Sequence, residues 1–283
     1  PACCLHDGVT LALAHPAPPP AMTVLMHLSD LHFGAHDPLA CAAVQRLAQR
    51  LGVAMVVVSG DLTQRATAEQ FEQAARFVQG LHARSNLVLA GNHDLPLFAW
   101  WMRWGRSYER FSEQFGMDQE PVRQMGAFYV VGVNTTRAWR HERGSLSSAQ
   151  IEHVALLLAR APPGAWRIVA SHHPLVARDA EDRDHRPRRA DEAVERWRIA
   201  GAQMLLSGHV HQPRLLQPLP GLWASSAGTA VSHRLRHGSP NSLVVLSTEA
   251  SGAALDGQAR VAARWDYDGA VGEFVCVDRV SAG

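Results

Sequence analysis

Short apolar runs recur along the chain, and each ends at a block of polar residues and glycines. Five of these runs are almost entirely apolar and are bounded by Gly, Pro, Ser or Asp, which is typical of strands buried on both faces. They cover residues 24–28, 55–58, 87–90, 168–170 and 204–206. Between the first three runs, residues 39–51 and 66–81 carry apolar side chains at helical spacing. This alternation predicts βαβ units and an α/β fold.

The pattern changes after residue 211. Four further short strands are predicted there, separated by turns that contain Gly, Ser, Pro or Asp: residues 222–225, 242–246, 260–266 and 273–277. Close turns favour antiparallel pairing. We expect these strands to complete the second sheet of a sandwich, with residues from about 249 to 283 as a C-terminal hairpin extension. The last hairpin could instead form the edge of a homodimer.

Residue types that can bind metal ions follow each of the five predicted strands. These blocks are Asp30-Leu31-His32, Gly60-Asp61, Gly91-Asn92-His93-Asp94, His172-His173 and Gly208-His209-Val210-His211. In βαβ sheets the functional site lies beyond the carboxyl ends of the strands. Asp and His suit Mn, Fe or Zn, and an Asn carbonyl adds an oxygen ligand. Each block alone is weak evidence, but five in this order predict a metal site.

These blocks resemble the calcineurin-like metallophosphoesterase superfamily, from about residue 22 to about residue 246, and most closely its bacterial class III phosphodiesterases of cyclic nucleotides and glycerophosphodiesters. The resemblance implies a four-layer αββα sandwich of two mixed sheets. It also implies two divalent ions (Mn, Fe or Zn). By motif, Asp30, His32 and His211 would hold the first ion, Asn92, His172 and His209 the second, and Asp61 would bridge them. His93 matches the catalytic histidine, and His173 and Asp94 would lie behind the ligands.

One position departs from the phosphoprotein phosphatases of this superfamily. Their Gly-Asp motif continues to an Asp that polarises the catalytic histidine, whereas Gln64 stands at that position here. An amide can orient an imidazole but cannot stabilise its cationic form as a carboxylate does. The sequence therefore argues against a protein phosphatase, and it leaves the partner of His93 open.

The chemistry expected of such a site is hydrolysis of a phosphoester. Two cations about 3.5–4 Å apart can share one water, lower its pKa and supply a bridging hydroxide that attacks phosphorus. His93 would protonate or stabilise the leaving oxygen. We expect a phosphodiester substrate such as a cyclic nucleotide. The alternatives are a UDP-2,3-diacylglucosamine-type pyrophosphate hydrolase and a non-catalytic scaffold that keeps the fold for protein binding.

Two segments near the motifs could contact substrate. Residues 97–115 interleave aromatic residues with arginines, and Trp100 and Arg103 are candidates for holding a base, a sugar or an acyl chain. For each aromatic residue taken singly, packing onto the domain is the favoured explanation. Residues 178–189 mix both charges and suggest an exposed loop, from which Arg178 could steer an anion.

The composition fits a soluble enzyme. Hydrophobic residues make up 47% of the 283 residues, and the net charge is +1, so no basic surface suggests nucleic acid as a partner. Four cysteines imply no disulfide framework, which favours a cytoplasmic location. Residues 1–21 are rich in proline, lack Lys and Arg, and contain no transmembrane segment. We expect them to be an extraneous tail before a single domain over 22–283.

Overall fold

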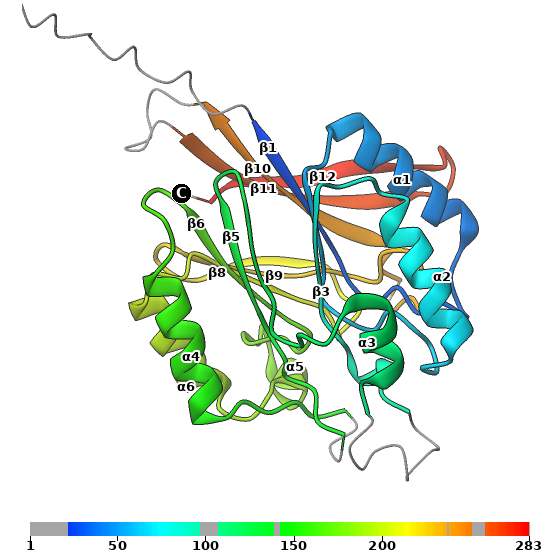
Figure 1. The fold of residues 1–283 in the computed structure, drawn as a ribbon. Coiled ribbons are helices and arrows are strands. Elements are labelled where there is room, and N and C mark those ends of the chain that lie inside the picture. Colours follow the sequence, from blue (N-terminus) through cyan, green and yellow to red (C-terminus); the bar gives the residue numbers. More distant parts are fainter. Residues whose placement is uncertain (1–21, 97–106, 139–141, 237, 251–257, 283) are drawn as a thin grey trace, which may run out of the picture.

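Two six-stranded sheets pack face to face, with helices on both outer sides (Figure 1). The computed structural model describes residues 22–96, 107–138, 142–236, 238–250 and 258–282. Helices α1 and α2 cover one sheet, while α4 and α6 cover the other (Figure 1). The predicted α/β fold and four-layer αββα sandwich are therefore confirmed.

The first sheet contains three parallel strands that are extended by an antiparallel ribbon. Its order is β12-β11-β10-β1-β2-β3. The strands are β1 (Thr23–Leu28), β2 (Met55–Val58), β3 (Ser85–Val88), β10 (Ser242–Ala250), β11 (Gln258–Asp268) and β12 (Glu273–Ser281). β1 pairs in parallel with β2 and antiparallel with β10, so it joins the two halves of the sheet.

The second sheet has the order β4-β5-β6-β7-β9-β8. Its strands are β4 (Val122–Met125), β5 (Phe128–Val133), β6 (Trp166–Ser171), β7 (Met204–Ser207), β8 (Arg214–Leu219) and β9 (Leu222–Ser226). β5, β6, β7 and β9 run parallel, and each edge strand is antiparallel to its neighbour.

Four of the six described α-helices begin where the sequence provides a capping side chain. The helices are α1 (Pro38–Leu51), α2 (Ala68–Gln79), α3 (Glu109–Phe115), α4 (Ser148–Ala159), α5 (Ala180–His185) and α6 (Ala190–Ile199). The Asp37 side chain accepts a hydrogen bond from Leu39 N at the start of α1, and Thr67 accepts one from Gln70 N at the start of α2. Each cap thereby satisfies one of the backbone N–H groups that the first turn leaves without a partner inside the helix.

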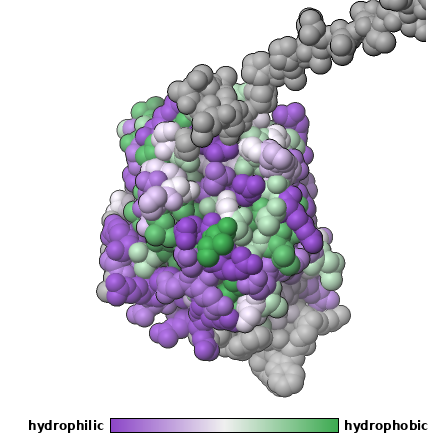
Figure 2. Space-filling view, turned by 90° about the vertical axis from the view of Figure 1, so that its left-hand side faces the viewer, coloured by the Kyte–Doolittle hydropathy of each residue, from purple (hydrophilic) through white to green (hydrophobic). Residues whose placement is uncertain are grey.

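Three apolar layers hold the sandwich together. Along β1 the side chains alternate, so Leu25 packs between the two sheets while Met26 packs against α1 and α2. On the far side, Trp197 of α6 is fully buried against the second sheet and donates its indole N–H to the Ile151 carbonyl of α4. The face that α4 and α6 cover is hydrophilic around a group of hydrophobic side chains (Figure 2).

The late strands differ from the prediction in one respect. β10, β11 and β12 belong to the first sheet, and of the four predicted late strands only β9 lies in the second. The short turns correctly indicated antiparallel pairing, but a turn does not determine which sheet edge a hairpin joins. β1 had a free edge opposite β2, and β10 occupies it in register from Thr23 to His27.

Two segments also need correction. Residues 178–189 are not a simple loop, because Asp179 accepts a hydrogen bond from Asp182 N and caps the short helix α5. In the aromatic segment, α3 covers only Glu109–Phe115, and residues 97–106 lie outside the described residues. No helix in the described part of the chain is long and apolar enough to span a membrane.

Candidate metal centre and active site

The polar blocks meet at one end of the sandwich because they follow strands that point the same way. Asp30 follows β1, Asp61 follows β2, and Asn92 opens a short 3-10 helix, η1 (Asn92–Asp94), after β3. His172 and His209 follow β6 and β7 of the second sheet. The site therefore lies where the carboxyl ends of parallel strands from both sheets converge.

Four side chains form the first cluster: Asp30, His32, Asp61 and His211. One ligand atom from each lies within 4.8 Å of all the others. His211 Nε2 is 3.1 Å from His32 Nε2 and 3.2 Å from Asp30 Oδ1. Two ring nitrogens that face each other share at most one proton, whereas a cation between them would accept both lone pairs. The donor set thus fits a divalent ion that prefers mixed nitrogen and oxygen ligands.

A second cluster adjoins the first through Asp61. His172 Nε2 lies 3.4 Å from Asp61 Oδ1 and 2.9 Å from Asn92 Oδ1. His209 Nδ1 lies 3.0 Å from the same Asn92 oxygen. An amide oxygen between two imidazole nitrogens is again an arrangement that a cation would satisfy. Asp61 has its other carboxylate oxygen 3.7 Å from His32 Nε2, so its two oxygens face different clusters.

The backbone of the ligand loops is strained. Five residues of the two clusters have positive φ: Asp30 (53°), His32 (46°), Asp61 (52°), His209 (71°) and His211 (54°). Non-glycine residues in this region cost about 1–3 kcal/mol each and persist only where the surroundings enforce them. Here backbone bonds between loops do so, for example from Asp30 N to Gly60 O and from His32 N to Asp61 O. Such concentrated strain is typical of a functional site.

Glycines allow these loops to touch. Gly91 packs directly against Asp61, so a Cβ there would overlap the Asp61 carboxylate. Gly60 has φ of +108°, and a Cβ there would lie 2.6 Å from His172 Nδ1. That nitrogen instead meets the Ser59 carbonyl at 2.9 Å, which directs the other ring nitrogen of His172 toward the cluster.

Burial sets the charge state of the clusters. Desolvation lowers the pKa of His32 to about 3 and holds the pKa of His209 well below its ordinary value. Burial alone would raise the pKa of Asp30, but the charge and hydrogen bond of His211 hold that pKa well below its usual range. His32 and His209 are therefore neutral, and Asp30 is anionic, at neutral pH, which are the forms that bind metal.

His27 on β1 should make the metal-free protein sensitive to acid. It is fully buried, its Nε2 is 2.9 Å from Ser59 Oγ, and desolvation lowers its pKa to about 3. Between pH 6.5 and 3 the unfolded chain binds a proton that the folded chain does not, so stability falls as the pH falls. In chelator-treated protein, His27→Gln should reduce the slope of unfolding free energy against pH by up to about 1.4 kcal/mol per unit. Equal slopes for parent and variant, from urea denaturation, would contradict this prediction.

His93 lies beside the ligands with both ring nitrogens oriented. Its Nδ1 is 3.2 Å from the backbone carbonyl of Gln64, and its Nε2 is 3.0 Å from Nη1 of Arg234. Its backbone N–H donates to Asp61 Oδ1 at 2.8 Å. Within the described residues, the Nδ1 partner that the sequence left open is a main-chain oxygen, while the Gln64 side chain accepts from Arg234 at 3.4 Å.

His173 and Asp94 are buried next to residues of the two clusters. His173 is buried, bonded through Nδ1 to Thr135 Oγ1 at 2.8 Å, and its ring centroid is 4.6 Å from that of His209. Asp94 accepts from Gly91 N at 2.8 Å and Thr63 N at 2.9 Å. It thereby joins the loops that follow β2 and β3.

The three proposed substrate contacts are not established. Trp100 and Arg103 lie outside the described residues. Arg178 is 58% exposed and its guanidinium pairs with its neighbour Asp179. In the part of the chain that the structure describes, no contact directs the Arg178 side chain toward the clusters.

Two residues near the clusters were not predicted. His185, the last residue of α5, has its Nδ1 3.2 Å from His209 Nε2. Arg234 lies in the segment between β9 and β10 and touches His93. The mixed charge of residues 178–189 indicated that the segment containing His185 could contact substrate. No local pattern in the sequence indicates a role for Arg234.

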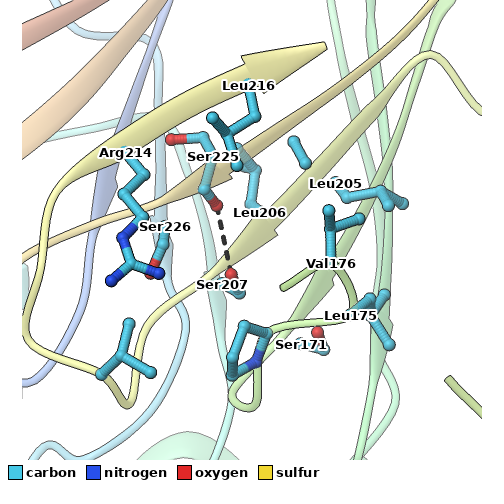
Figure 3. A pocket seen from close by; sticks show the side chains of 13 residues that line it. Ser171, Leu175, Val176, Leu205, Leu206, Ser207, Arg214, Leu216, Ser225 and Ser226 are labelled. Carbon is cyan, nitrogen blue, oxygen red and sulfur yellow. Dashed lines mark hydrogen bonds between the residues drawn. The ribbon is translucent and has the colours of Figure 1, made fainter. Parts of the chain in front are cut away.

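A small cavity lies beside β7 (Figure 3). Its walls include Ser207, whose hydroxyl donates to the Ser225 carbonyl at 3.2 Å, and Arg214, which forms a buried ion pair with Asp182 of α5. The cavity volume of about 20 Å³ is enough for about one water. It is therefore too small to be a substrate pocket.

A family comparison identifies the chain. Residues 23–213 match the model of the calcineurin-like phosphoesterases, so the chain belongs to that family. It is a metallophosphoesterase with a buried Asp/His metal-binding cluster. A comparison with curated proteins gives no match.

Solved structures share the fold at low sequence identity. A purple acid phosphatase from yellow lupin (PPD1) superposes with a TM-score of 0.69 and 14% identity over 95% of this chain, which spans only 55% of the phosphatase chain. A dimetal phosphatase from Danio rerio gives 0.62 and 12%, covering 93% of this chain and 99% of its own. GAP50 of Plasmodium, described as the anchor in the inner membrane complex, gives 0.64 and 12%, covering 93% and 89%. The fold alone therefore does not determine the function within the family. The function has to be argued from the residues of the two clusters.

Proposed function

We propose that the protein is a dinuclear metal-dependent phosphodiesterase, with cyclic nucleotides as the first substrate class to test. One observation carries the proposal: seven ligand side chains from five strand ends converge in two clusters that share Asp61. A single tetrahedral ion would use four ligands. Asp30, His32 and His211 would bind one ion, and Asn92, His172 and His209 the other.

The bound metal ions and the protein side chains would have separate roles in catalysis. When bound, two divalent cations such as Mn, Fe or Zn would neutralise phosphate oxygens and lower the pKa of a water so that it supplies hydroxide near neutral pH. Asp61 would hold the two ion sites at a fixed separation through its two oxygens. The strained loops fix the ligands in advance, so little reorganisation is needed when substrate binds.

His93 would act on the leaving oxygen. Its Nδ1 faces the Gln64 carbonyl at 3.2 Å, so Nδ1 carries the proton in the neutral ring and Nε2 faces the site. A positioned imidazole contributes about 10²–10⁴-fold by general acid–base catalysis. Because Nε2 bears a lone pair in this tautomer, it would first accept a proton that derives from the water and then pass it to the leaving oxygen. The carbonyl of Gln64 orients the ring without adding a full negative charge.

A small diester suits the site better than an acylated pyrophosphate. An acyl chain would need an apolar groove, for which the aromatic segment was the candidate. Its described residues are used in packing: Phe111 is 1% exposed and lies against Phe71, and the Tyr108 hydroxyl bonds Thr136 Oγ1 at 2.7 Å. The part of this segment that the structure describes, residues 107–115, therefore offers no acyl groove, which supports the phosphodiester over the UDP-diacylglucosamine alternative.

The test is metal content together with a substrate panel. Protein loaded with Mn²⁺ should contain two ions per chain, measured by elemental analysis. It should hydrolyse 3′,5′-cyclic AMP, a glycerophosphodiester or bis(4-nitrophenyl) phosphate faster than 4-nitrophenyl phosphate or UDP-diacylglucosamine. Saturated activity with one ion per chain would contradict the dinuclear site, and a preference for the monoester would contradict the diester.

A further inference from the structure

The segment between β9 and β10 is bound tightly to the loop of the first metal cluster. The Thr229 hydroxyl donates to the Asp30 carbonyl at 2.7 Å, and Ala230 N donates to the Ser29 carbonyl at 3.1 Å. Asn241 donates its side-chain amide to the carbonyls of Thr229 and Ser232. These bonds, buried in the sandwich, place the following residues with little freedom.

Arg234 ends this anchored stretch and contacts the active site in two ways. Its backbone carbonyl faces His211 Nδ1 at 2.8 Å and so orients a proposed metal ligand. Its guanidinium Nη1 lies 3.0 Å from His93 Nε2 and 3.4 Å from Gln64 Oε1. The side chain is half-buried, so its charge is less screened than that of a surface arginine.

The tautomer of His93 determines the direction of its hydrogen bond with Arg234. Because the Nδ1 N–H of His93 donates to the Gln64 carbonyl, Nε2 presents a lone pair, and the guanidinium donates to it. Arginine stays charged and offers several donors in a rigid fork, so it can keep one donor on His93 and aim another at an oxyanion. Arg234 is thus a fixed positive charge at the side of the site where His93 would meet the leaving group.

We propose that Arg234 binds the departing oxygen of the phosphoester, beside His93, and so enables hydrolysis of esters with poor leaving groups. This inference rests on the proposed function. As oxygen from water bonds to phosphorus, the bond from phosphorus to the leaving oxygen breaks, and its electron pair goes to that oxygen. Arg234 compensates the charge by hydrogen bonding. The leaving oxygen ends with a proton that derives from the water.

Kinetics of Arg234→Met test this role, because methionine removes the charge and keeps the backbone carbonyl that His211 contacts. On alkyl diesters kcat should fall about 10²-fold, the typical cost of removing one oxyanion donor. On bis(4-nitrophenyl) phosphate, whose leaving group needs little help, the loss should be several-fold smaller. Arg234→Lys should recover part of the rate. Arg65→Met, an exposed arginine next to Gln64, should change neither substrate.

A binding measurement separates this inference from the proposed function. Calorimetric titration of the Mn²⁺-loaded protein with inorganic phosphate should show about 10-fold weaker binding for Arg234→Met than for the parent or Arg65→Met, because a charged hydrogen bond is lost. Metal content should stay at the parent's value. If the parent hydrolyses no diester, the proposed function fails, and phosphate affinity alone decides on Arg234.

Two results would overturn the inference. Equal losses on alkyl and aryl esters with parent-like phosphate affinity would show that Arg234 does not touch the reacting group. Loss of metal in Arg234→Met would show that the residue only supports His211. In contrast, a non-additive double variant with His93→Ala would support a shared task, since residues that act as a unit give less than additive losses.

Discussion

Asp61→Asn should lose both metal ions and reduce kcat/KM by at least about 10³-fold, the equivalent of several kcal/mol of transition-state stabilisation. The reason is position. Asp61 is 1% exposed, with one oxygen 3.4 Å from His172 Nε2 and the other 3.7 Å from His32 Nε2. An amide fits the same space, but it lacks the negative charge and offers only one oxygen to two ions. Elemental analysis and kinetics on the same preparation measure the two losses.

Asp268→Asn is the matched control. Asp268 is the last residue of β11 and accepts from Ala270 N, in the turn to β12, at 2.8 Å, a bond that asparagine can also accept. This variant should keep both ions and the parent's rate. If Asp61→Asn kept two ions and lost only activity, Asp61 would be acting on substrate or water and not as a bridging ligand.

The convergence of the candidate ligands could be predicted because secondary structure and chemistry pointed to the same positions. Asp30, Asp61 and Asn92 each follow a run of apolar residues, and parallel strands necessarily end at one edge. Order along the chain was therefore enough to bring them together, although they are about 30 residues apart. The His residues of the second sheet follow the same rule.

The remaining features depend on contacts that no local pattern encodes. β10 to β12 joined the first sheet because β1 had an unpaired edge, which is a property of the assembled sheet. The partner of His93 could not be predicted from residue types because it is the main-chain oxygen of Gln64. Arg234 is 141 residues from His93 in sequence and reaches it only because hydrogen bonds fix the segment that precedes it.

His93→Ala should separate chemistry from metal binding. The ring contacts the Gln64 carbonyl and Arg234, and its centroid is 4.9 Å from that of His32, but none of the ligand distances in either cluster depends on it. Both ions should therefore remain. On an alkyl phosphodiester kcat should fall by about 10²-fold or more, because the leaving oxygen loses its proton donor or charge partner.

The dependence on leaving group identifies what His93 does. A 4-nitrophenyl leaving group needs little protonation, so His93→Ala should lose much less activity on that ester than on an alkyl ester. His153→Ala, on the exposed face of α4, serves as the control and should match the parent on both esters. Equal activity of His93→Ala and parent on the alkyl diester would leave Arg234 as the group that meets the departing oxygen. Equal losses on both esters would place His93 at the nucleophile or the phosphate oxygens, and not at the leaving group.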